Sequence, residues 1–437
     1  MKKNNLEIID KNLLRKIAKY ESDDIYNQLP ISWHSAKNHK VYNREGKVWI
    51  DFTSSIFVTN IGHCNKEVER AIINVTKKLS HAYSYPTQYR ADLSEYLIKI
   101  SPSNLQKVIL LTTGSEAIER AIKLSKIYGM KKNKKYIVCW NGNYHGKTQG
   151  SQMLSGDSKQ REWIGLKDKT IIRLPFPNHH EDPKKQFEKH INIIKKNKIN
   201  LSEIASFFIE TYQGWAGIFY PKEYIKQLRN LCDKKNSLMI FDEIQSGFGR
   251  TGKLFGFQHY GVKADLVVCA KAISNGLPLS AIIGKKSIIN LDPSYTSTHG
   301  GHPICCAASL ATLKFIKSNN LINKSAIKGK IVKDFLYKLR DKYPKHITEI
   351  HGHGLVWGVV TKKQTSSVPD VILCNQIVKY CYNNGLLILK TNRGSLKLAP
   401  PLTIPISDLN KGLRIIEDAF SENQPLPNNN KKTSINA

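Results

Sequence analysis

Residues 237–271 have the sequence SLMIFDEIQSGFGRTGKLFGFQHYGVKADLVVCAK, and this stretch decides the fold. It contains two short apolar runs, 237–241 and 265–270, separated by a glycine-rich loop. Short apolar runs bounded by turn residues are typical of strands that are buried on both faces. The first run ends at Asp242 and the second at Lys271, so each predicted strand carries an ionisable side chain to its carboxyl end.

The same pattern continues on the N-terminal side of this stretch. Three further apolar runs lie at 108–113, 136–140 and 206–210, and they alternate with amphipathic stretches of helical spacing such as 116–129 and 223–235. Alternating runs of this kind predict an α/β fold whose mostly parallel sheet is flanked by helices. We expect this large domain to span residues 66–318.

The two chain ends predict a second, smaller α+β domain. We assign to it an N-terminal segment and a C-terminal segment, residues 1–65 and 319–424, and predict a disordered tail at 425–437. The elements expected there are two short strands around a turn at Glu45–Gly46, a helix over 327–343, a strand pair starting near Gly354 and a final helix around 409–420.

The chain is strongly basic. Lys and Arg number 67 against 35 Asp and Glu, which gives a net charge of +32, and such an excess invites a nucleic-acid interpretation. The lysines, however, are spread from Lys2 to Lys432, without an aromatic RNA-binding cluster, a zinc-finger spacing or an arginine-rich arm. We therefore interpret the charge as a property of the whole surface that concentrates anionic ligands, and expect no nucleic-acid partner.

Cysteine usage and hydropathy indicate the compartment. None of the eight cysteines forms a Cys-x-x-Cys pair, and several lie inside apolar runs, so we expect free, buried thiols and no metal site. Charges interrupt the first residues where a signal peptide needs an apolar core, and no run approaches the ~20 apolar residues of a membrane span. These features predict a cytoplasmic protein with no membrane partner.

The glycine loop GFGRTGKL, residues 247–254, almost matches two nucleotide motifs. Its G-x-x-x-x-G-K pattern is followed by Leu254, whereas a P-loop needs a Ser or Thr hydroxyl there for magnesium. Its G-x-G-x-x-G pattern requires an acidic residue ~20 positions later, at the end of a second strand. Asp265 lies before its strand instead, which disfavours both nucleotide motifs.

Four predicted strand ends carry a set of groups that fits one cofactor. Gly114 and Ser115 begin a helix and would bind an anion such as phosphate, and an aromatic and an imidazole side chain, Tyr144 and His145, follow the next strand. Carboxyl ends of parallel strands are where ligands bind in open α/β sheets. Burial would lower the pKa of Lys271 and favour a nucleophilic amine. Phosphate site, aromatic ring, carboxylate and buried lysine together suit pyridoxal 5′-phosphate (PLP).

Residues 241–284 also resemble the signature of the class III, or omega-type, aminotransferases of PLP fold type I. The similarity extends over nearly the whole chain, from YNREGKVWIDFTSS at 42–55 to LKLAPPLTI at 396–404. The signature is specific because the glycine loop, the Asp and the Lys all have the family's spacing. The resemblance implies a large PLP-binding domain with a smaller α+β domain built from both chain ends.

Roles around the cofactor ring follow from the resemblance. It implies that Lys271 forms the Schiff base and that Asp242 pairs with the pyridinium nitrogen. It further implies that Gln245 lies near the phenolic oxygen, while Ile244 and Tyr144 pack on opposite ring faces.

The remaining cofactor contacts are implied in the same way. Gly114 and Ser115 match the phosphate-binding turn, and His145 belongs to the same group of cofactor-binding residues. Glu210 resembles the acid that orders the site behind the ring. Thr298 resembles the residue that reaches the phosphate from the neighbouring subunit, which implies a homodimer with shared active sites.

Two departures from the family pattern concern the substrate. Lys397 occupies the position where members acting on glutamate-linked pairs usually carry an arginine clamp for the α-carboxylate, and a lysine lacks the bidentate fork. Trp215 stands where ornithine-type members place a glutamate that neutralises that arginine. Arg393 is a candidate replacement for the clamp, and neutral drift, with the carboxylate bound elsewhere, explains the substitutions equally well.

These observations predict a PLP-dependent aminotransferase that works by a ping-pong mechanism. The expected donor is an omega-amino acid, a diamine or an amino sugar, for example 4-aminobutyrate, and the expected acceptor is a 2-oxo acid. An amino-acid racemase or aminomutase on the same scaffold is the alternative. A nucleic-acid-binding protein on an inactive scaffold is a remote third hypothesis.

Overall fold

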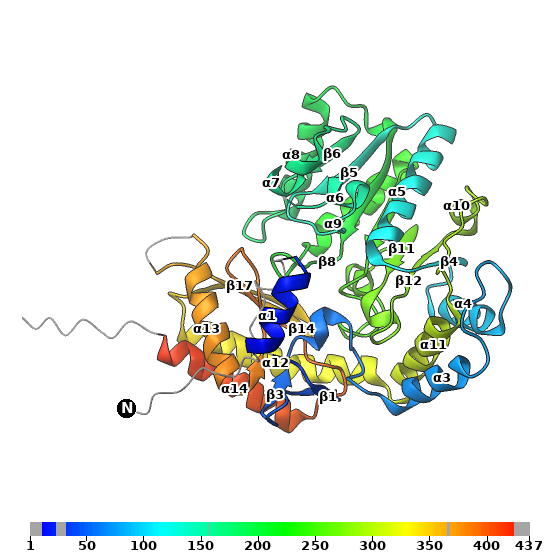
Figure 1. The fold of residues 1–437 in the computed structure, drawn as a ribbon. Coiled ribbons are helices and arrows are strands. Elements are labelled where there is room, and N and C mark those ends of the chain that lie inside the picture. The colour runs from blue at the N-terminus through cyan, green and yellow to red at the C-terminus, as the bar shows by residue number, and fades with distance from the viewer. Residues whose placement is uncertain (1–10, 23–31, 157, 365–367, 424–437) are drawn as a thin grey trace, which may run out of the picture.

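The computed structural model describes residues 11–22, 32–156, 158–364 and 368–423. Its largest sheet has seven strands in the order β4-β12-β11-β10-β7-β5-β6 (Figure 1). Their bounds are Lys107–Leu111 for β4, Tyr136–Trp140 for β5, Ile171–Leu174 for β6, Ile204–Glu210 for β7, Leu238–Asp242 for β10, Leu266–Cys269 for β11 and Ser280–Gly284 for β12. All five apolar runs that the sequence marks as strands lie in this sheet.

The sheet is mostly parallel, as expected. Only β12 runs antiparallel to its two neighbours, β11 and β4, within this sheet. Every residue of β7 and β10 is buried, which is why both strands have nearly continuous apolar sequences. The predicted fold class, a mostly parallel sheet flanked by helices, is confirmed.

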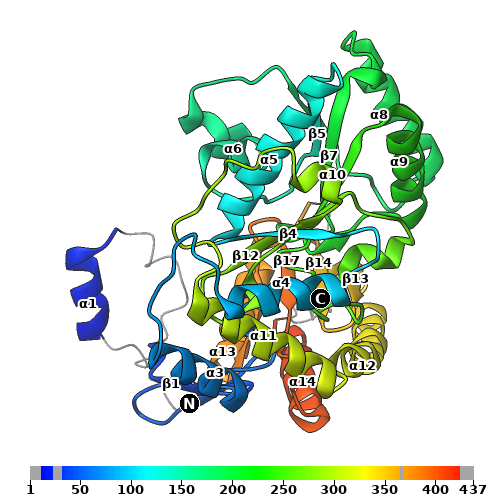
Figure 2. The same ribbon diagram turned by 90° about the vertical axis from the view of Figure 1, so that its right-hand side faces the viewer.

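Helices cover both faces of this sheet. Figure 2 shows α5 (Gly114–Lys131) and α6 (Gln149–Met153) on one face and α8 (Pro183–Lys196) and α9 (Lys222–Lys235) on the other. Helix α5 begins with a capping box, in which the side chain of Thr113 accepts a hydrogen bond from the Glu116 amide while Glu116 bonds back. The buried face of α5 packs on the strands and so fixes its N-terminus at the carboxyl end of β4.

One further helical group and several short elements are also present in the described residues. Helix α11 (Pro303–Ser318) packs against α3 (Lys66–Thr76) and α4 (Gln88–Ile100). The other elements are α1 (Lys11–Tyr20), α2 (Ser54–Phe57), α7 (Ser158–Arg161), α10 (Lys286–Ile289), η2 (Glu162–Ile164), η3 (Leu201–Glu203), η4 (Gly256–Tyr260), η5 (Lys271–Ile273) and the strand pair β8 (Tyr212–Gln213) and β9 (Ile218–Phe219).

The chain ends meet in space, as the sequence predicts. Strand β3 (Val48–Asp51) pairs in parallel with β15 (Leu386–Leu387), in a sheet completed by β1 (Ser35–Lys37) and β2 (Lys40–Tyr42). The helices α12 (Leu321–Lys342), α13 (Val371–Asn383) and α14 (Ile406–Glu422) lie together below the large sheet in Figure 1. The exact domain boundaries stay a prediction, and the tail 425–437 lies outside the described residues.

The expected strand pair near Gly354 is wrong in one respect. Gly354, with a φ of +54°, forms the turn between β13 (Ile347–His353) and β14 (Val356–Thr361), so the first strand precedes it. Strand β14 then pairs with β17 (Ser395–Leu398), which also pairs with β16 (Leu389–Lys390). The polar sequence of β13, with only two of its residues buried, does not have the alternation that marks a strand.

Arg250 in the glycine loop connects three parts of the chain. Its guanidinium is fully buried and donates to the carbonyl oxygens of Leu355, at 2.9 Å, and Pro400. It also donates to Oγ of Ser54, at 3.1 Å, and to the side-chain oxygen of Asn60. The glycine loop 247–254, which resembles nucleotide motifs, is therefore hydrogen-bonded to both the N-terminal and the C-terminal segment.

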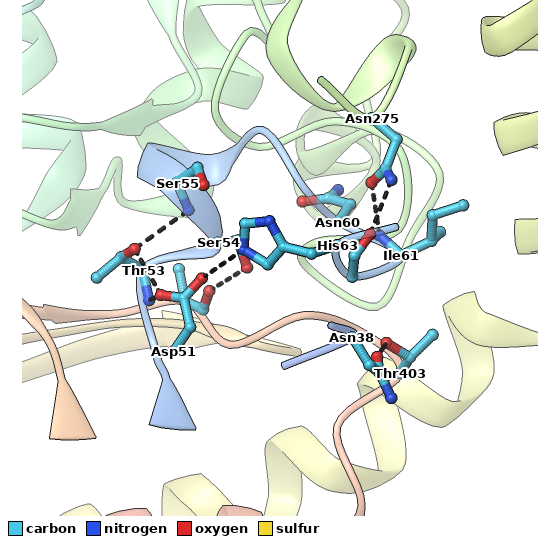
Figure 3. Close-up of polar contacts among 12 residues, drawn as sticks. Asn38, Asp51, Thr53, Ser54, Ser55, Asn60, Ile61, His63, Asn275 and Thr403 are labelled. Carbon is cyan, nitrogen blue, oxygen red and sulfur yellow. Dashed lines mark hydrogen bonds and ion pairs between the residues drawn. The ribbon is translucent and has the colours of Figure 1, made fainter. Parts of the chain in front are cut away.

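The N-terminal segment that accepts hydrogen bonds from Arg250 has a strained backbone. Residues 54–57 have φ values of +47°, +50°, +59° and +68°, a left-handed turn that costs non-glycine residues roughly 1–2 kcal/mol each. Figure 3 shows the compensating bonds: the carboxylate of Asp51 accepts from the amide and hydroxyl of Thr53, and Thr53 accepts from the amide of Ser55 at 3.1 Å. The hydroxyl of Ser54 donates to the carbonyl of Ala399 at 2.6 Å.

We predict that Arg250→Met lowers the free energy of unfolding by about 3–5 kcal/mol, because several buried acceptors lose their donor at once. Urea unfolding followed by circular dichroism measures this loss. Arg414→Met, at an exposed position of α14, is the matched control. A loss no larger than that of the control would contradict the role of Arg250 as the link between the three segments.

Candidate active site

The ionisable residues that end the central strands face one cavity of about 400 Å³. Strands β7 and β10 run parallel with Glu210 beside Asp242, and Lys271 follows β11, the neighbour of β10. The cavity brings together these predicted cofactor residues: Gly114, Ser115, Tyr144, His145, Glu210, Asp242, Ile244, Gln245 and Lys271. Val58, from the strained N-terminal segment, also lines it.

Two hydrogen bonds position Asp242 in the lining of this cavity. Its side chain is buried, and Oδ2 lies 2.8 Å from Nδ1 of the buried His145. Carboxylate oxygens only accept hydrogen bonds, so Nδ1 of His145 carries the proton in this pair. The other oxygen, Oδ1, accepts from the amide of Ile244 at 3.0 Å. These two hydrogen bonds fix the position of the Asp242 side chain.

Lys271 is presented to the cavity by a strained backbone. It begins the short turn η5 and has a φ of +47°, a left-handed conformation that costs a non-glycine residue about 1–3 kcal/mol. Burial lowers the pKa of its amine, although the carboxylates of Asp242 and Glu210 oppose this effect. A lowered pKa increases the fraction of neutral amine, which is the form that attacks a carbonyl carbon.

Glu210 organises the loops beside Asp242. Its two oxygens accept from the amides of Tyr144, at 2.7 Å, and Gly214, at 3.0 Å. Burial, with the repulsion of Asp242, raises the pKa of Glu210 to about 8. Glu210 therefore takes up a proton more readily than an ordinary glutamate does.

One end of the cavity is shaped to receive an anion. It is formed by the first turn of α5 together with Gly114 and Gly146. A Cβ on Gly114 would lie 2.9 Å from Cδ1 of Ile244, and one on Gly146, whose φ is +142°, would collide with the side chains of Ser115 and Ser151. Gly146 thus requires glycine, whereas a side chain at Gly114 would only displace the end of Ile244. The amides of a helix N-terminus attract a phosphate.

Gln245, another residue of the cavity lining, has a side-chain oxygen whose hydrogen-bonding capacity is unused. The side-chain oxygen of Gln245 is buried and has no hydrogen-bond partner among the described residues. A Cβ on Gly214 would collide with the amide group of Gln245, so the glycine leaves room for this side chain. A bound group with a hydroxyl would satisfy the orphaned oxygen. Together with the amine, the carboxylate and the phosphate site, this atom shows that the residues present fit PLP.

The predicted substrate residues lie outside the lining of this cavity. Lys397 is buried, and its Nζ donates to the carbonyl of Gly214 at 2.8 Å and lies 5.0 Å from the centre of the Phe57 ring. Burial and the nearby Lys271 lower the pKa of Lys397 to about 8. The guanidinium of Arg393 stacks over the ring of Trp215, 4.9 Å from its centre.

Thr298 is exposed and does not line the cavity of its own chain either. Its carbonyl accepts from Nε2 of His81 at 2.9 Å. Its role at the phosphate of a neighbouring subunit stays a prediction, as do the individual cofactor contacts of the other site residues.

Sequence reasoning missed two features of the site. The bond between His145 and Asp242 joins residues far apart in sequence, and only the position of His145 after a predicted strand hinted at it. Val58 reaches the cavity because residues 54–57 adopt the left-handed turn, for which the non-glycine sequence gives no signal.

The site and the sheet together define a PLP enzyme of fold type I. The chain matches the family model for aminotransferase class-III over residues 22–420. It is 31% identical over 405 residues to the acetylornithine aminotransferase of Clostridium acetobutylicum, covering 90% of this chain and 97% of that enzyme. It is 33% identical over 395 residues to the isoleucine 2-epimerase of Lentilactobacillus buchneri, covering 86% and 87%.

The chain therefore belongs to the class III aminotransferases, and it is a PLP-dependent aminotransferase. The structure of taurine:2-oxoglutarate aminotransferase from Bifidobacterium kashiwanohense, in complex with PLP and glutamate, superposes with a TM-score of 0.87. The two chains are 23% identical over 95% of this chain and 98% of that one, a likeness that shows the shared fold. The predicted family, fold, enzyme class and cofactor are confirmed.

The structure also bears on the predictions about membrane-spanning helices and cysteines. No helix in the described part of the chain is long and apolar enough to cross a membrane. All eight cysteines are free, and seven of them are buried. The homodimer and the cytoplasmic location stay predictions.

We predict that Asp242→Asn reduces kcat by about 10²–10⁴-fold, the range for loss of a group that positions a proton. A neutral amide no longer favours a proton on the ring nitrogen of the cofactor. Steady-state kinetics at saturating PLP measure the effect, and Asp418→Asn, at an exposed position of α14, is the control. Near-normal turnover of the Asp242 variant would show that another residue holds the ring nitrogen.

Proposed function

We propose that the enzyme transfers the amino group of an omega-amino acid, a diamine or an amino sugar to a 2-oxo acid by a ping-pong mechanism. The observation that carries this proposal is the placement of Lys271, with its lowered pKa, in the same cavity as the fixed carboxylate of Asp242. A donor such as 4-aminobutyrate has its reactive amine at the end remote from the carboxylate, as acetylornithine does. The acetylornithine aminotransferase relative supports a donor of this kind.

The residues divide the chemistry among them. When bound, PLP supplies an aldehyde carbon that accepts amines and a ring that accepts electrons. Lys271 provides the amine that holds the cofactor, and its Nζ then takes up and returns the proton of the substrate carbon. Asp242, aligned by His145, holds a proton on the ring nitrogen.

The remaining groups position the cofactor. We propose that Gly114 and Ser115, at the N-terminus of α5, bind its phosphate and that Tyr144 and Ile244 flank its ring. Gln245 would accept a hydrogen bond from its ring hydroxyl through the side-chain oxygen, which has no partner among the described residues. Each contact fixes the reacting carbon near Lys271, so that proton transfer needs little rearrangement.

With Lys397 at the position of the arginine clamp, substrates that need no bidentate contact with their carboxylate are favoured. Lys397 is buried and already donates to the carbonyl of Gly214, and it offers a point charge where a fork would bind a carboxylate. Arg393, stacked on Trp215 from the turn between β16 and β17, is the candidate to bind a substrate carboxylate instead. A small acceptor such as pyruvate should therefore be used at least as well as 2-oxoglutarate.

A racemase or epimerase is the second candidate. The isoleucine 2-epimerase relative, 33% identical over most of both chains, favours it, because proton return to the opposite face of the same carbon needs the same lysine and carboxylate. The hypothesis of an inactive nucleic-acid-binding scaffold is dropped, because the chain is an enzyme of this family.

The assembly and location also belong to this proposal. We propose a homodimer in which Thr298, exposed on its own chain, reaches the phosphate of the neighbouring site. We propose a cytoplasmic enzyme on the basis of the free cysteines, which suit a reducing compartment.

A panel of amino donors, each incubated with and without pyruvate or 2-oxoglutarate, tests the proposed function. Chiral chromatography of the products separates the outcomes. We expect the donor to become a carbonyl compound only when an oxo acid is present. Inversion of the donor's own stereocentre without an oxo acid would instead identify a racemase.

We predict that Lys271→Ala abolishes turnover and leaves the protein folded, because the phosphate site and Asp242 still bind PLP. Turnover assays, together with circular dichroism and equilibrium dialysis of PLP, measure these properties. Lys286→Ala, an exposed lysine at the start of α10, is the control. Full activity of the Lys271 variant would exclude this lysine from the chemistry.

We predict that Lys397→Arg improves kcat/KM for 2-oxoglutarate by ~1–2 kcal/mol, or about 5–30-fold, because a fork replaces a point charge. Binding of a diamine donor should weaken, since Trp215 cannot neutralise the new charge. Kinetics with both acceptors and a diamine measure these effects, with Lys390→Arg on the same hairpin as the control. A strong wild-type preference for 2-oxoglutarate, unchanged in the Lys397 variant, would mean that the carboxylate is bound elsewhere.

A further inference from the structure

A second cavity, of about 810 Å³, shares no lining residue with the active-site cavity. One wall consists of the glycine loop near Lys253, the turn η4 and the start of α9 at Lys222. The opposite wall consists of α12 and β13, which lie side by side in Figure 2. The cavity is thus a cleft between the large sheet and the C-terminal part of the chain.

The lining of this cleft is positively charged and contains no carboxylate. Four lysines and four histidines line it: Lys222, Lys253, Lys330, Lys333, His179, His259, His351 and His353. The acid at its edge, Glu349, is already bound by His351 and lies 3.0 Å from His180. The lysine charges of the cleft are therefore not neutralised by acids in its lining.

The imidazoles of the cleft are packed in two pairs. The rings of His259 and His353 stack at 4.1 Å with an interplanar angle of 12°, and those of His179 and His351 lie 4.5 Å apart. Nε2 of His259 lies 3.0 Å from the carbonyl of Thr251, which holds that ring in the wall.

Burial, and after it the neighbouring charges, act on these rings. Desolvation and the neighbouring Lys253 and Lys222 lower the pKa of His259, and desolvation, His259 and Lys333 lower that of His353. Positive neighbours that depress a histidine indicate a positive potential, which an anion would neutralise.

The lysines lie on both walls of the cleft. Lys330 and Lys333 are one turn apart on α12, whereas Lys222 and Lys253 come from the opposite wall. A ligand that contacts both walls must carry negative charge at several points along its length. The volume is about twice that of the cavity that fits PLP, so one phosphate group would leave most of it unfilled.

We propose that this cleft binds a small polyphosphate, either inorganic or carried by a nucleotide, which bridges the glycine loop and α12. Lysine ammonium groups suit phosphate oxygens as mobile point charges. A ligand held by both walls stabilises the folded chain by mass action. This site does not depend on the reaction proposed above.

Calorimetric titration of the PLP-loaded enzyme with tripolyphosphate at about 0.15 M ionic strength tests the proposal. The loaded cofactor already fills the other phosphate site. We expect one binding event per chain. The double variant Lys253→Glu/Lys333→Glu should weaken binding by at least about tenfold.

The control is Lys338→Glu/Lys345→Glu, which changes the net charge equally at exposed lysines outside the cleft and should shift Kd by no more than about twofold. Unchanged turnover of both double variants verifies folding. ATP binding tighter than tripolyphosphate would identify a nucleotide ligand, and equal affinity an inorganic one. An absence of binding, or an equal loss in both double variants, would overturn the proposal.

Discussion

A charged carboxylate at the buried end of an apolar strand needs compensation, and Asp242 obtains it from its surroundings. Taking a carboxylate out of water costs several kcal/mol unless donors or positive charge replace the lost hydration. His145 and the amide of Ile244 supply the donors, and the pKa of Glu210, beside Asp242 on the neighbouring strand, is raised. The position of each neighbouring loop follows from this requirement, because these groups arrive from three different strand ends.

The loops around Asp242 are held in place by strained backbone segments and by the buried guanidinium of Arg250. Lys271 and the segment 54–57 adopt left-handed backbone conformations that only surrounding contacts maintain. Arg250 supplies part of those contacts by fastening the glycine loop to Ser54 and to the C-terminal segment at Pro400. The glycine loop therefore serves the architecture of the site, and its far side also forms a wall of the lysine-lined cleft.

The sequence predicts what depends on local pattern. Apolar runs such as 265–270 mark the buried strands, and their last residues mark the site, because strand ends meet at one edge of a parallel sheet. It does not predict what depends on tertiary contacts. Strand β13 is stabilised by pairing with β14 despite its polar sequence, and Lys397 turns out to donate to the carbonyl of Gly214, a bond between residues distant in the chain.

The central claim is that the amine at the end of β11 is the one that holds the cofactor. Reduction of the PLP-loaded enzyme with borohydride, followed by peptide mapping with mass spectrometry, tests it directly. The account predicts a single stable adduct on Lys271. An adduct on another lysine, with Lys271 unmodified, would contradict the assignment of the active site.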